Sequence, residues 1–379
     1  MSGWTTKKLG EVCESISTRG CQIQQNEICD IGKFPVVSQS EAFIEGYTDF
    51  ENAIENIPVV LFGDHTCCVK YIDFPFVVGA DGTKLLTAKQ FEVKFLYYAI
   101  LKISSSLVDG KYRRHFKDLK KCDIPIPPLA EQKRIVAKID VAFEKIDSLK
   151  TNAEKNLANA KELFQSALDE AMRPKKGWVE KRLGEVCSKI GSGATPRGGK
   201  TSYCSKGISL IRSMNVYDCA FEYSELAHIN DMQAKELANV TIEANDVLIN
   251  ITGASVARCC VVPSDVMPAR VNQHVAILRI ADNRFLNPDF LCYSLVAPAR
   301  KSLLLGIGEA GSTRQALTKT DLSLFKIKIP DIFEQKRIVE RVKVVAQANE
   351  ALQQNYERQV ADCAEMRQAI LREAFGGRP

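Results

Sequence analysis

The sequence predicts an α+β protein in which two globular units of mixed helix and strand are joined by two long antiparallel coiled-coil helices. Glu-Gln-Lys-Arg-Ile-Val occurs twice, at 131–136 and 334–339. Each copy opens a run in which apolar residues recur at alternating spacings of four and three, which is the period of a coiled coil. The segments 3–13 and 177–187 agree at eight of eleven positions. That agreement marks an internal duplication, so we expect a pseudo-two-fold repeat.

The two long helices are predicted over 129–174 and 330–379. Each run begins just after proline, which suits the first turn of a helix. Asn156 and Asn349 fall in the seams, where they either set the register or fill satisfied polar gaps. Two amphipathic helices in separate cores are the alternative, but such helices are usually shorter. The predicted seams include Ile135, Ile139, Leu149, Ala153, Ala160 and Leu163 in the first run, and Ile338, Val342, Leu352, Cys363 and Ile370 in the second.

The globular units are predicted over 1–128 and 175–329. Their starts lie 174 residues apart and their helix openings 203 apart, so the second unit is longer by 29 residues. Short β-branched and aromatic runs separated by Gly and Asp predict strands. The clearest strand candidates are Pro58–Phe62, Phe74–Val78, Asp246–Ile251 and His274–Ile280, with final strands at 124–127 and 327–330. The clearest helix candidates are Val93–Ser104 and Pro288–Leu304.

Connectivity predicts the direction of the coil. The first helix leaves the first unit and delivers the chain to the second unit. The second helix leaves the second unit and can pair with the first only by running back. We therefore expect an antiparallel coil with one globular unit at each end.

Composition sets broad limits. The 379 residues are too many for one core, and 26% charged with 45% hydrophobic residues is ordinary for a soluble protein. The formal charge of +5 is weak, so an anion-binding surface must arise by clustering. Thirteen cysteines form no regular framework, and neither a signal peptide nor a membrane-length apolar run is evident. We expect reduced thiols and a cytoplasmic protein.

Several catalytic hypotheses fail on spacing. In 193–201, five residues rather than four precede Gly-Lys-Thr, which does not fit a phosphate-binding P-loop. Asp331 and Glu334 are too close for a nuclease motif, and the first repeat has Pro128 in place of Asp331. No Asn/Asp-Pro-Pro-aromatic signature of an amino-methyltransferase is present. Cys67 and Cys68 lack a second ligand pair at finger spacing, so no metal site is predicted.

The remaining candidates are basic and polar loops. Residues 111–121 carry six basic residues and one acidic residue, with two aromatic residues between them. Such side chains bind phosphates and read base edges, although a solvated surface is the alternative for any one of them. The candidate DNA contacts are Ser38, Gln39, His65, Lys70, Lys111, Tyr112, Arg113, Arg114 and Lys117 in the first unit, and Thr195, Arg197, Lys200, Arg212, Asn215, Arg258, Asn272, Gln273, Thr313, Arg314 and Gln315 in the second.

The layout resembles the specificity subunits of type I restriction–modification systems over essentially the whole chain. The words that carry this resemblance are the duplicated Pro-x-x-Glu-Gln-Lys-Arg-Ile at the helix openings, Leu-Gly-Glu-Val at both unit starts, Gly191-Ser-Gly-Ala-Thr-Pro, Gly253-Ala-Ser, Asn272-Gln-His-Val and Tyr112-Arg-Arg-His-Phe.

The resemblance implies a non-catalytic subunit in which each unit is a target-recognition domain for one half of a bipartite DNA site. It also implies that the helices set the spacing and dock two methylation subunits, with restriction subunits added in the full complex. S-adenosylmethionine is then expected on the methylation subunit, and no cofactor on this chain. The candidate partner-binding residues are Glu131, Gln132, Lys133, Arg134, Glu334, Gln335, Lys336 and Arg337.

Two other functional classes remain open from the residues alone. One is a coiled-coil scaffold whose end domains bind proteins, and the other is an enzyme that acts by itself. The missing catalytic motifs argue against the enzyme. A neighbouring methyltransferase gene would favour the specificity subunit over the scaffold.

Overall fold

The computed structural model describes residues 4–79, 82–108, 112–309 and 316–376. The chain divides into two compact units. Unit 1 comprises residues 1–155 and 356–379, and unit 2 comprises residues 156–355. Each unit therefore contains a globular part and a portion of both long helices.

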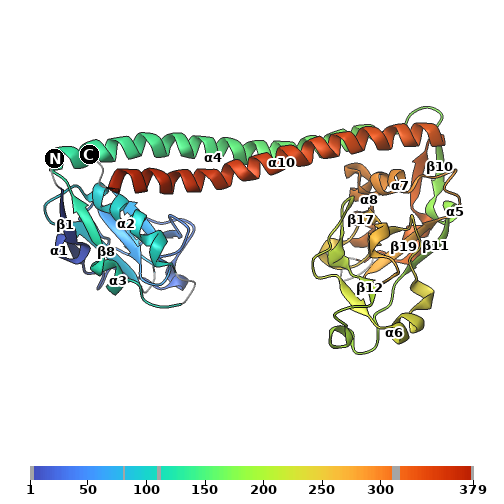
Figure 1. The fold of residues 1–379 in the computed structure, drawn as a ribbon, viewed down its shortest axis with the longest axis horizontal. Helices are drawn as coiled ribbons and strands as arrows, with labels where there is room; N and C mark the ends of the chain where they lie inside the picture. The colour runs from blue at the N-terminus through green and yellow to red at the C-terminus, as the bar shows by residue number, and fades with distance from the viewer. Residues whose placement is uncertain (1–3, 80–81, 109–111, 310–315, 377–379) are drawn as a thin grey trace. The chain divides into compact units, whose positions relative to one another are not determined.

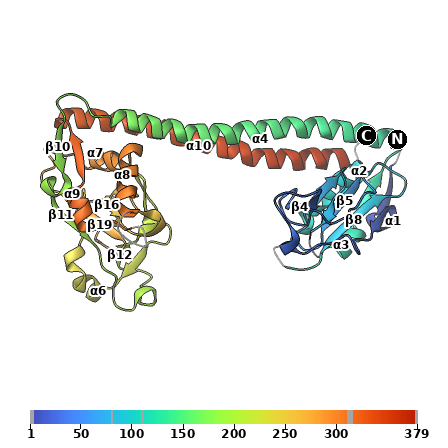
Figure 2. The ribbon, with the colours of Figure 1, turned by 180° about the vertical axis from the view of Figure 1, so that it is seen from behind.

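Unit 1 is built on a four-stranded antiparallel sheet in the order β2-β8-β5-β6 (Figure 1). A three-stranded sheet has the order β4-β3-β7, with β3 and β7 parallel, and Figure 2 labels its edge strand β4. The strands are β1 (Thr5–Lys8), β2 (Cys13–Ile16), β3 (Phe34–Val37), β4 (Gly46–Thr48), β5 (Val59–Gly63), β6 (Val69–Ile72), β7 (Val77–Val78), β8 (Thr83–Ala88) and β9 (Asp123–Ile126). The helices are α1 (Leu9–Val12), the 3-10 turn η1 (Gln25–Glu27), α2 (Val93–Leu107) and α3 (Phe116–Lys121).

Strand β5 is buried on both faces, which explains its uninterrupted apolar sequence. Side chains alternate along a strand, so neighbouring residues of β5 face opposite sides. Val60 and Phe62 pack with Phe95 of α2 in one core. Val59 and Leu61 pack with residues of the smaller sheet in another. Strand β5 is therefore the central element of unit 1.

Unit 2 repeats this arrangement with a sheet in the order β11-β19-β16-β17 and a second sheet in the order β15-β12-β18. The strands are β10 (Val179–Arg182), β11 (Cys187–Ser192), β12 (Ile208–Ile211), β13 (Val216–Tyr217), β14 (Ala220–Phe221), β15 (Ala227–Ile229), β16 (Val247–Asn250), β17 (Cys259–Val261), β18 (Ala269–Val271), β19 (Val275–Ile280) and β20 (Lys326–Ile329). The helices are α5 (Leu183–Val186), α6 (Asp231–Glu236), α7 (Pro288–Val296), α8 (Pro298–Glu309) and α9 (Lys319–Leu324). The 3-10 turns are η2 (Gly199–Ser202), η3 (Ser213–Asn215), η4 (Ala238–Val240), η5 (Gly253–Ser255) and η6 (Ser264–Val266).

In both units the first strand pairs with the last one before the long helix. Strand β1 pairs antiparallel with β9, and β10 pairs antiparallel with β20. The start of each repeat is thereby fixed beside the segment that enters its helix. The predicted internal duplication is confirmed at the level of strand order.

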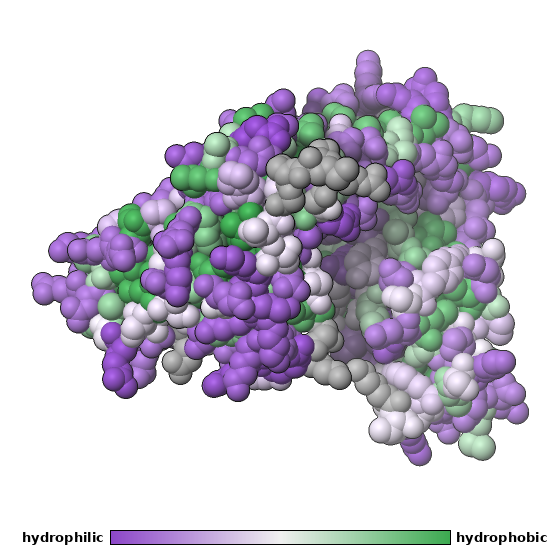
Figure 3. Space-filling view, turned by 60° about the vertical axis from the view of Figure 1, so that its left-hand side comes forward, coloured by the Kyte–Doolittle hydropathy of each residue, from purple (hydrophilic) through white to green (hydrophobic). Residues whose placement is uncertain are grey.

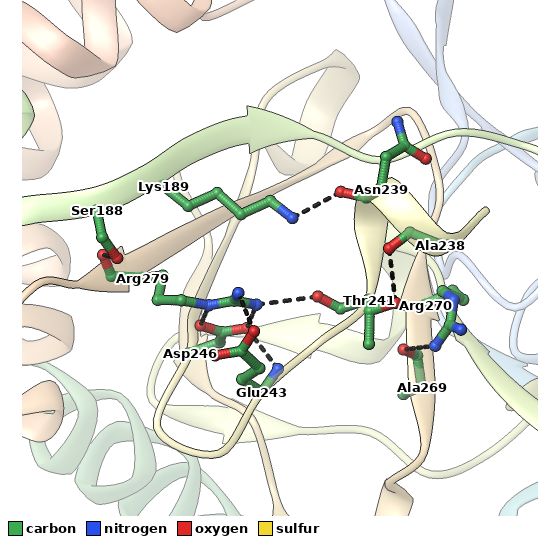
Figure 4. A network of polar contacts seen from close by, with 10 residues as sticks. All are labelled: Ser188, Lys189, Ala238, Asn239, Thr241, Glu243, Asp246, Ala269, Arg270 and Arg279. Atoms are coloured by element: carbon green, nitrogen blue, oxygen red, sulfur yellow. Dashed lines mark hydrogen bonds and ion pairs between the residues drawn. The ribbon is translucent and has the colours of Figure 1, made fainter.

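The extra length of unit 2 includes the β13–β14 hairpin, α6 and η4, all between β12 and β16. An arginine on the central strand β19 fixes the end of this insertion (Figure 4). The Arg279 guanidinium donates to both carboxylate oxygens of buried Asp246 at 2.8 Å, and to the Thr241 carbonyl at 2.9 Å. Lys189 on β11 donates to the Asn239 carbonyl at 2.6 Å. The insertion is thus held against the main sheet by charge-assisted hydrogen bonds.

The long helices are α4 (Leu129–Ala171) and α10 (Ile332–Phe375), as the seam period predicts. Within unit 1, Arg367 of α10 contacts Asp147 of α4 at 2.6 Å. Within unit 2, Leu168 of α4 shares a core with Val342 of α10. Residue 147 of α4 thus lies beside residue 367 of α10, whereas residue 168 shares a core with residue 342. The two helices are therefore antiparallel.

The predicted seam is only partly correct. Ile135, Ile139, Ala153 and Ala160 of α4 are buried, and so are Ile338, Val342 and Cys363 of α10. Leu149, Leu163 and Leu352 are instead exposed, because through the middle of α4 only one position in each heptad is buried, at Ile146, Ala153 and Ala160. Asn349 is buried with an unpaired side-chain oxygen, whereas Asn156 is exposed and does not lie in the seam.

Two other predicted elements differ in detail. The helix predicted over Pro288–Leu304 is two helices, because Pro298 has no amide hydrogen to continue α7, and the α7–α8 pair is bent by 70°. The strand predicted over Phe74–Val78 is reduced to Val77–Val78. All thirteen cysteines are free thiols, as expected.

One ion pair occurs in both units with its charges exchanged. In unit 1, Lys94 of α2 contacts Asp140 of α4 at 2.8 Å. In unit 2, Asp289 of α7 contacts Lys343 of α10, also at 2.8 Å. Each pair connects a globular part to its own long helix. The repeat has therefore kept the contact while reversing its polarity.

Candidate nucleic-acid interface

The predicted contact residues of unit 1 gather where β5 ends. Asp64, which follows β5 directly, is buried and holds the loop that precedes α3. Its carbonyl accepts from the His115 amide at 2.8 Å, and its carboxylate accepts from the Phe116 amide at 2.9 Å. No pattern in the sequence singles out Asp64. It is the residue that brings the basic loop to the end of the sheet.

The outer surface of this loop is aromatic and cationic. The rings of Tyr112 and His65 are stacked, with centroids 4.8 Å apart and planes 6° apart. Tyr112 is 88% exposed despite this support. The Arg114 side chain is 79% exposed and lies 4.0 Å from the Asp64 carboxylate. A rigid exposed ring beside an exposed guanidinium suits stacking and phosphate contacts.

The other basic residues of the loop differ in whether an acidic side chain within the fold already binds them. The Arg113 guanidinium donates to Asp118 at 2.6 Å and thereby lowers the pKa of that carboxyl. Lys117 is exposed on α3. Lys111 lies outside the described residues. Arg114 is therefore better placed than Arg113 to meet a phosphate.

Ser38, Gln39 and Lys70 support the neighbouring loop. The buried Lys70 ammonium donates to the Ser38 carbonyl at 2.9 Å and to the Ala42 carbonyl, and burial lowers its pKa. The Ser38 hydroxyl donates to Glu45. The Gln39 side-chain oxygen accepts from the His65 amide at 3.2 Å. These contacts position His65 and leave Lys70 turned away from solvent.

The corresponding end of the sheet in unit 2 lies between β16 and β19. The Leu317 amide donates to the Ile251 carbonyl at 2.8 Å, which brings the segment before α9 to this edge. Gly193 packs so tightly that an added Cβ would lie 2.0 Å from the Val271 carbonyl oxygen. A glycine is required there for the 193–200 loop to approach the turn at Asn272.

Two predicted residues of unit 2 are structural. Asn215 is fully buried, and its amide donates to the carbonyls of Glu222 and Ser224 at 2.9 and 3.3 Å. Asn272 is 6% exposed, and its side-chain oxygen accepts from the His274 amide at 3.1 Å. Both shape loops rather than presenting side chains to the surface.

Of the other predicted residues of unit 2, three are exposed, and Arg212 and Arg258 are half-buried. Thr195, Arg197 and Gln273 are exposed. The Arg212 guanidinium donates to the Glu225 carbonyl and lies 5.7 Å from the Tyr203 ring centre. Arg258 lies 4.5 Å from the centre of the Tyr217 ring. Thr313, Arg314 and Gln315 lie outside the described residues, and so does the side chain of Lys200.

The predicted partner-binding segments contain a buried clamp in each repeat. Gln132 donates to the Pro127 carbonyl at 2.8 Å and accepts from the Glu92 amide at 3.0 Å. Gln335 donates to the Pro330 carbonyl and accepts from the Asn287 amide at 2.8 Å. Each glutamine therefore ties the start of a long helix to the start of the helix that covers the sheet.

The other residues of these segments face solvent. Arg134 pairs with Glu131 and Arg337 with Glu334, each three residues apart on one helix. The hydrogen bond from Arg134 lowers the pKa of the Glu131 carboxyl. Two exposed lysines, Lys133 and Lys336, make no ion pair with any described residue. They are the residues of these segments most available to a partner.

Three further observations concern the surface, potential metal ligands and helix length. The face of the molecule drawn in Figure 3 is mainly hydrophilic, with hydrophobic residues in scattered groups. No group of three potential metal-ligating side chains is found among the described residues. No single described helix has the length and apolar character to cross a membrane, although the bent pair α7–α8 passes that test of length and composition jointly.

The chain is similar to proteins of one family. A family model described as "Type I restriction modification DNA specificity domain" matches residues 1–158 and 175–360. The Type I restriction enzyme EcoR124I/EcoR124II specificity subunit of Escherichia coli is 25% identical over 346 residues, covering 88% of this chain and 84% of that protein.

Solved structures share the fold. A chain from a study of complex assembly and conformational transition in the type I R-M system gives a TM-score of 0.75 at 22% identity, with 100% of this chain and 98% of that chain covered. The HsdS subunit from Thermoanaerobacter tengcongensis gives a TM-score of 0.54 at 22% identity, covering 99% and 97%.

Proposed function

The chain belongs to the family of type I restriction–modification DNA specificity domains, and we propose that its two units each read one half of a bipartite DNA target. In this proposal α4 and α10 fix the unread spacing between the half-sites. The chain is a non-catalytic specificity subunit, as its relatives are. The reaction on DNA is carried out by separate subunits.

The observation that carries the proposal is the equivalence of the two sheet ends. In unit 1, the loop after β5 and the loop before α3 present Tyr112 and Arg114. In unit 2, the loop after β16 and the turn before β19 present Arg258 and Gln273. The corresponding ends of the two sheets thus display different donors and rings, which supports two different half-sites.

The partners follow from the family. We propose double-stranded DNA, two methylation subunits and, in the full complex, restriction subunits. S-adenosylmethionine is then held by the methylation subunit, and a target on cellular DNA implies the cytoplasm. The exposed Lys133 and Lys336 at the helix openings are proposed docking residues, whereas Gln132 and Gln335 act inside the fold.

Co-expression with a methylation subunit tests the proposal. Sequencing that detects methylated adenine across the host genome should return one bipartite motif, present only when both chains are made. The purified chain alone should transfer no methyl group from S-adenosylmethionine. Methylation without a motif, or turnover by the lone chain, would contradict the proposed division of labour.

A further inference from the structure

Unit 2 contains an open hollow beside the end of β16. Its volume is about 450 Å³, and its lining includes Tyr217, Thr252, Ser255, Arg258 and His274. Thr252 forms a β-bridge with Ala316, which follows the predicted contact residues 313–315. The hollow therefore lies among the loops that the sequence assigns to DNA.

The Arg258 guanidinium is held in place by a ring rather than by a carboxylate. It lies 4.5 Å from the Tyr217 ring centre, and Tyr217 itself is 42% exposed. No ion pair joins Arg258 to a described residue, whereas Arg279 and Arg284 of the same unit are both paired. Stacking orients the planar guanidinium and leaves its N–H groups for another acceptor.

The Thr252 hydroxyl is a second hydrogen-bond donor, and it is oriented by contacts that link the side chains of Gln273, His274 and Thr252. The Gln273 side-chain nitrogen lies 3.2 Å from Nε2 of His274, and Nδ1 of that ring lies 2.6 Å from the Thr252 hydroxyl. In the tautomer in which the Gln273 amide donates to Nε2, Nδ1 carries the proton. That proton is donated to the Thr252 oxygen. The Thr252 hydroxyl hydrogen is then left for an acceptor in the hollow.

The hollow thus offers donors without negative charge. Arg258, Thr252 and Ser255 all supply N–H or O–H groups, and none of its lining residues is Asp or Glu. Two groups on DNA consist of closely spaced acceptors: a phosphate, and the O6 and N7 atoms of guanine in the major groove. A phosphate needs only an exposed cation, which Arg197 on the neighbouring loop already supplies.

An arginine immobilised in a concave site has the geometry for two parallel hydrogen bonds to guanine, the commonest specific arginine contact with a base. We propose that this hollow is the guanine-reading subsite of unit 2, with Arg258 donating to O6 and N7. The assignment rests on the proposed function. It goes further by naming the base class and the residue that reads it.

The test uses the full chain assembled with its methylation subunit. The wild-type motif is first obtained from methylated genomic DNA, and Arg258→Lys is then compared with it on a library randomised at each motif position. Lysine keeps the charge but cannot form the bidentate contact. We expect preference for guanine at one position of one half-site to fall on the order of tenfold to a hundredfold, with the other half-site unchanged.

Arg284→Lys is the matched control, because Arg284 is exposed and paired with Asp282 in the same unit. It should leave the motif unchanged. An independent arm keeps the wild-type protein and replaces the identified guanine by 7-deazaguanine, which lacks the N7 acceptor. The loss should be of similar size, and combining it with Arg258→Lys should add little.

The outcomes separate the two levels of the proposal. If the wild-type complex shows no bipartite motif, the proposed function itself fails. If the motif is present but Arg258→Lys leaves every position unchanged, Arg258 contacts phosphate or solvent and the guanine assignment is overturned. A uniform loss of affinity over all sequences in Arg258→Ala, without a change in preference at any position, would also overturn it.

Discussion

Substituting Gln335 by methionine removes a buried clamp while keeping the approximate length of the side chain. Gln335 is fully buried, and its amide donates to the carbonyls of Phe285 and Pro330, both at 2.9 Å. Its oxygen accepts from the Asn287 amide at 2.8 Å. Methionine fills the space but leaves these three backbone groups without their partner.

The magnitude follows from the number of groups left unpaired. A buried polar group that loses its only partner costs about 1–3 kcal/mol, so three such groups predict that Gln335→Met lowers the free energy of unfolding of unit 2 by about 3–9 kcal/mol. Gln132 makes two such hydrogen bonds, and Gln132→Met should lower the free energy of unfolding of unit 1 by about 2–6 kcal/mol.

The two tryptophans make the measurement specific to each unit. Trp4 is in unit 1 and Trp178 is in unit 2, and they are the only tryptophans in the chain. In a Trp4→Phe background, fluorescence during urea denaturation reports unit 2. Gln347→Met is the control, because Gln347 is an exposed glutamine of α10 that also lies in unit 2. It should change the free energy of unfolding by less than about 0.5 kcal/mol.

The exposed lysine beside the clamp allows docking to be tested separately from stability. Neutralising the exposed Lys336 should leave stability unchanged while weakening association with the methylation subunit. If Gln335→Met lowers the free energy of unfolding of unit 2 no more than Gln347→Met does, the clamp does not stabilise the fold. If it leaves stability intact but abolishes association, Gln335 belongs to the docking surface instead.

Three further predictions concern DNA binding, the ion pair and the spacing. Arg114→Gln should weaken DNA binding for all sequences and reduce the slope of log affinity against log salt by about one; an unchanged slope would remove Arg114 from the phosphate contacts. Asp289→Lys should destabilise unit 2, and adding Lys343→Asp should restore about 1 kcal/mol, since unit 1 uses the exchanged polarity; a double-mutant cycle without coupling would contradict this. Inserting four residues after Lys150 together with four after Gln353 adds about 6 Å of helix. Methylome mapping should then show the same half-sites with a gap longer by one or two base pairs, and an unchanged gap would place the ruler elsewhere.

The repeat, the long helices and the central strands were predictable because local patterns determine them. The run Val59–Phe62 is apolar at every position because both faces of β5 are covered. The seam failed where packing geometry, rather than hydrophobicity, decides which residues face inward. Leu149 has the spacing of a seam residue, but only its neighbours in the seam, Ile146 and Ala153, are buried.

The candidate interface was predictable only as a set of loops. Their polar composition indicated nucleic-acid binding, but composition does not tell which polar side chain is used inside the fold. The side chains of Lys70 and Asn215 donate hydrogen bonds to backbone carbonyls, and no sequence pattern reveals these contacts. Asp64 and Thr252 were missed because their roles depend on loops that are distant in sequence.

The two buried glutamines also show that the sequence does not separate structural residues from surface residues. The family resemblance implies a docking role for the duplicated Glu-Gln-Lys-Arg segment. In the structure, Gln132 and Gln335 are buried, and the lysines beside them are exposed. Duplication therefore indicated that these positions matter, without separating their structural from their surface roles.

Exchange of one unit tests the central claim most directly. Residues 14–118 are replaced by the corresponding segment of another specificity subunit, which leaves β1, β9 and both long helices in place. The chimera is expressed with the methylation subunit, and methylated adenines are mapped across the genome. If each unit reads one half-site, one half of the motif changes, while the other half and the length of the gap stay as in the wild type. Alteration of both halves, or retention of the original motif, would contradict the assignment of one half-site to each unit.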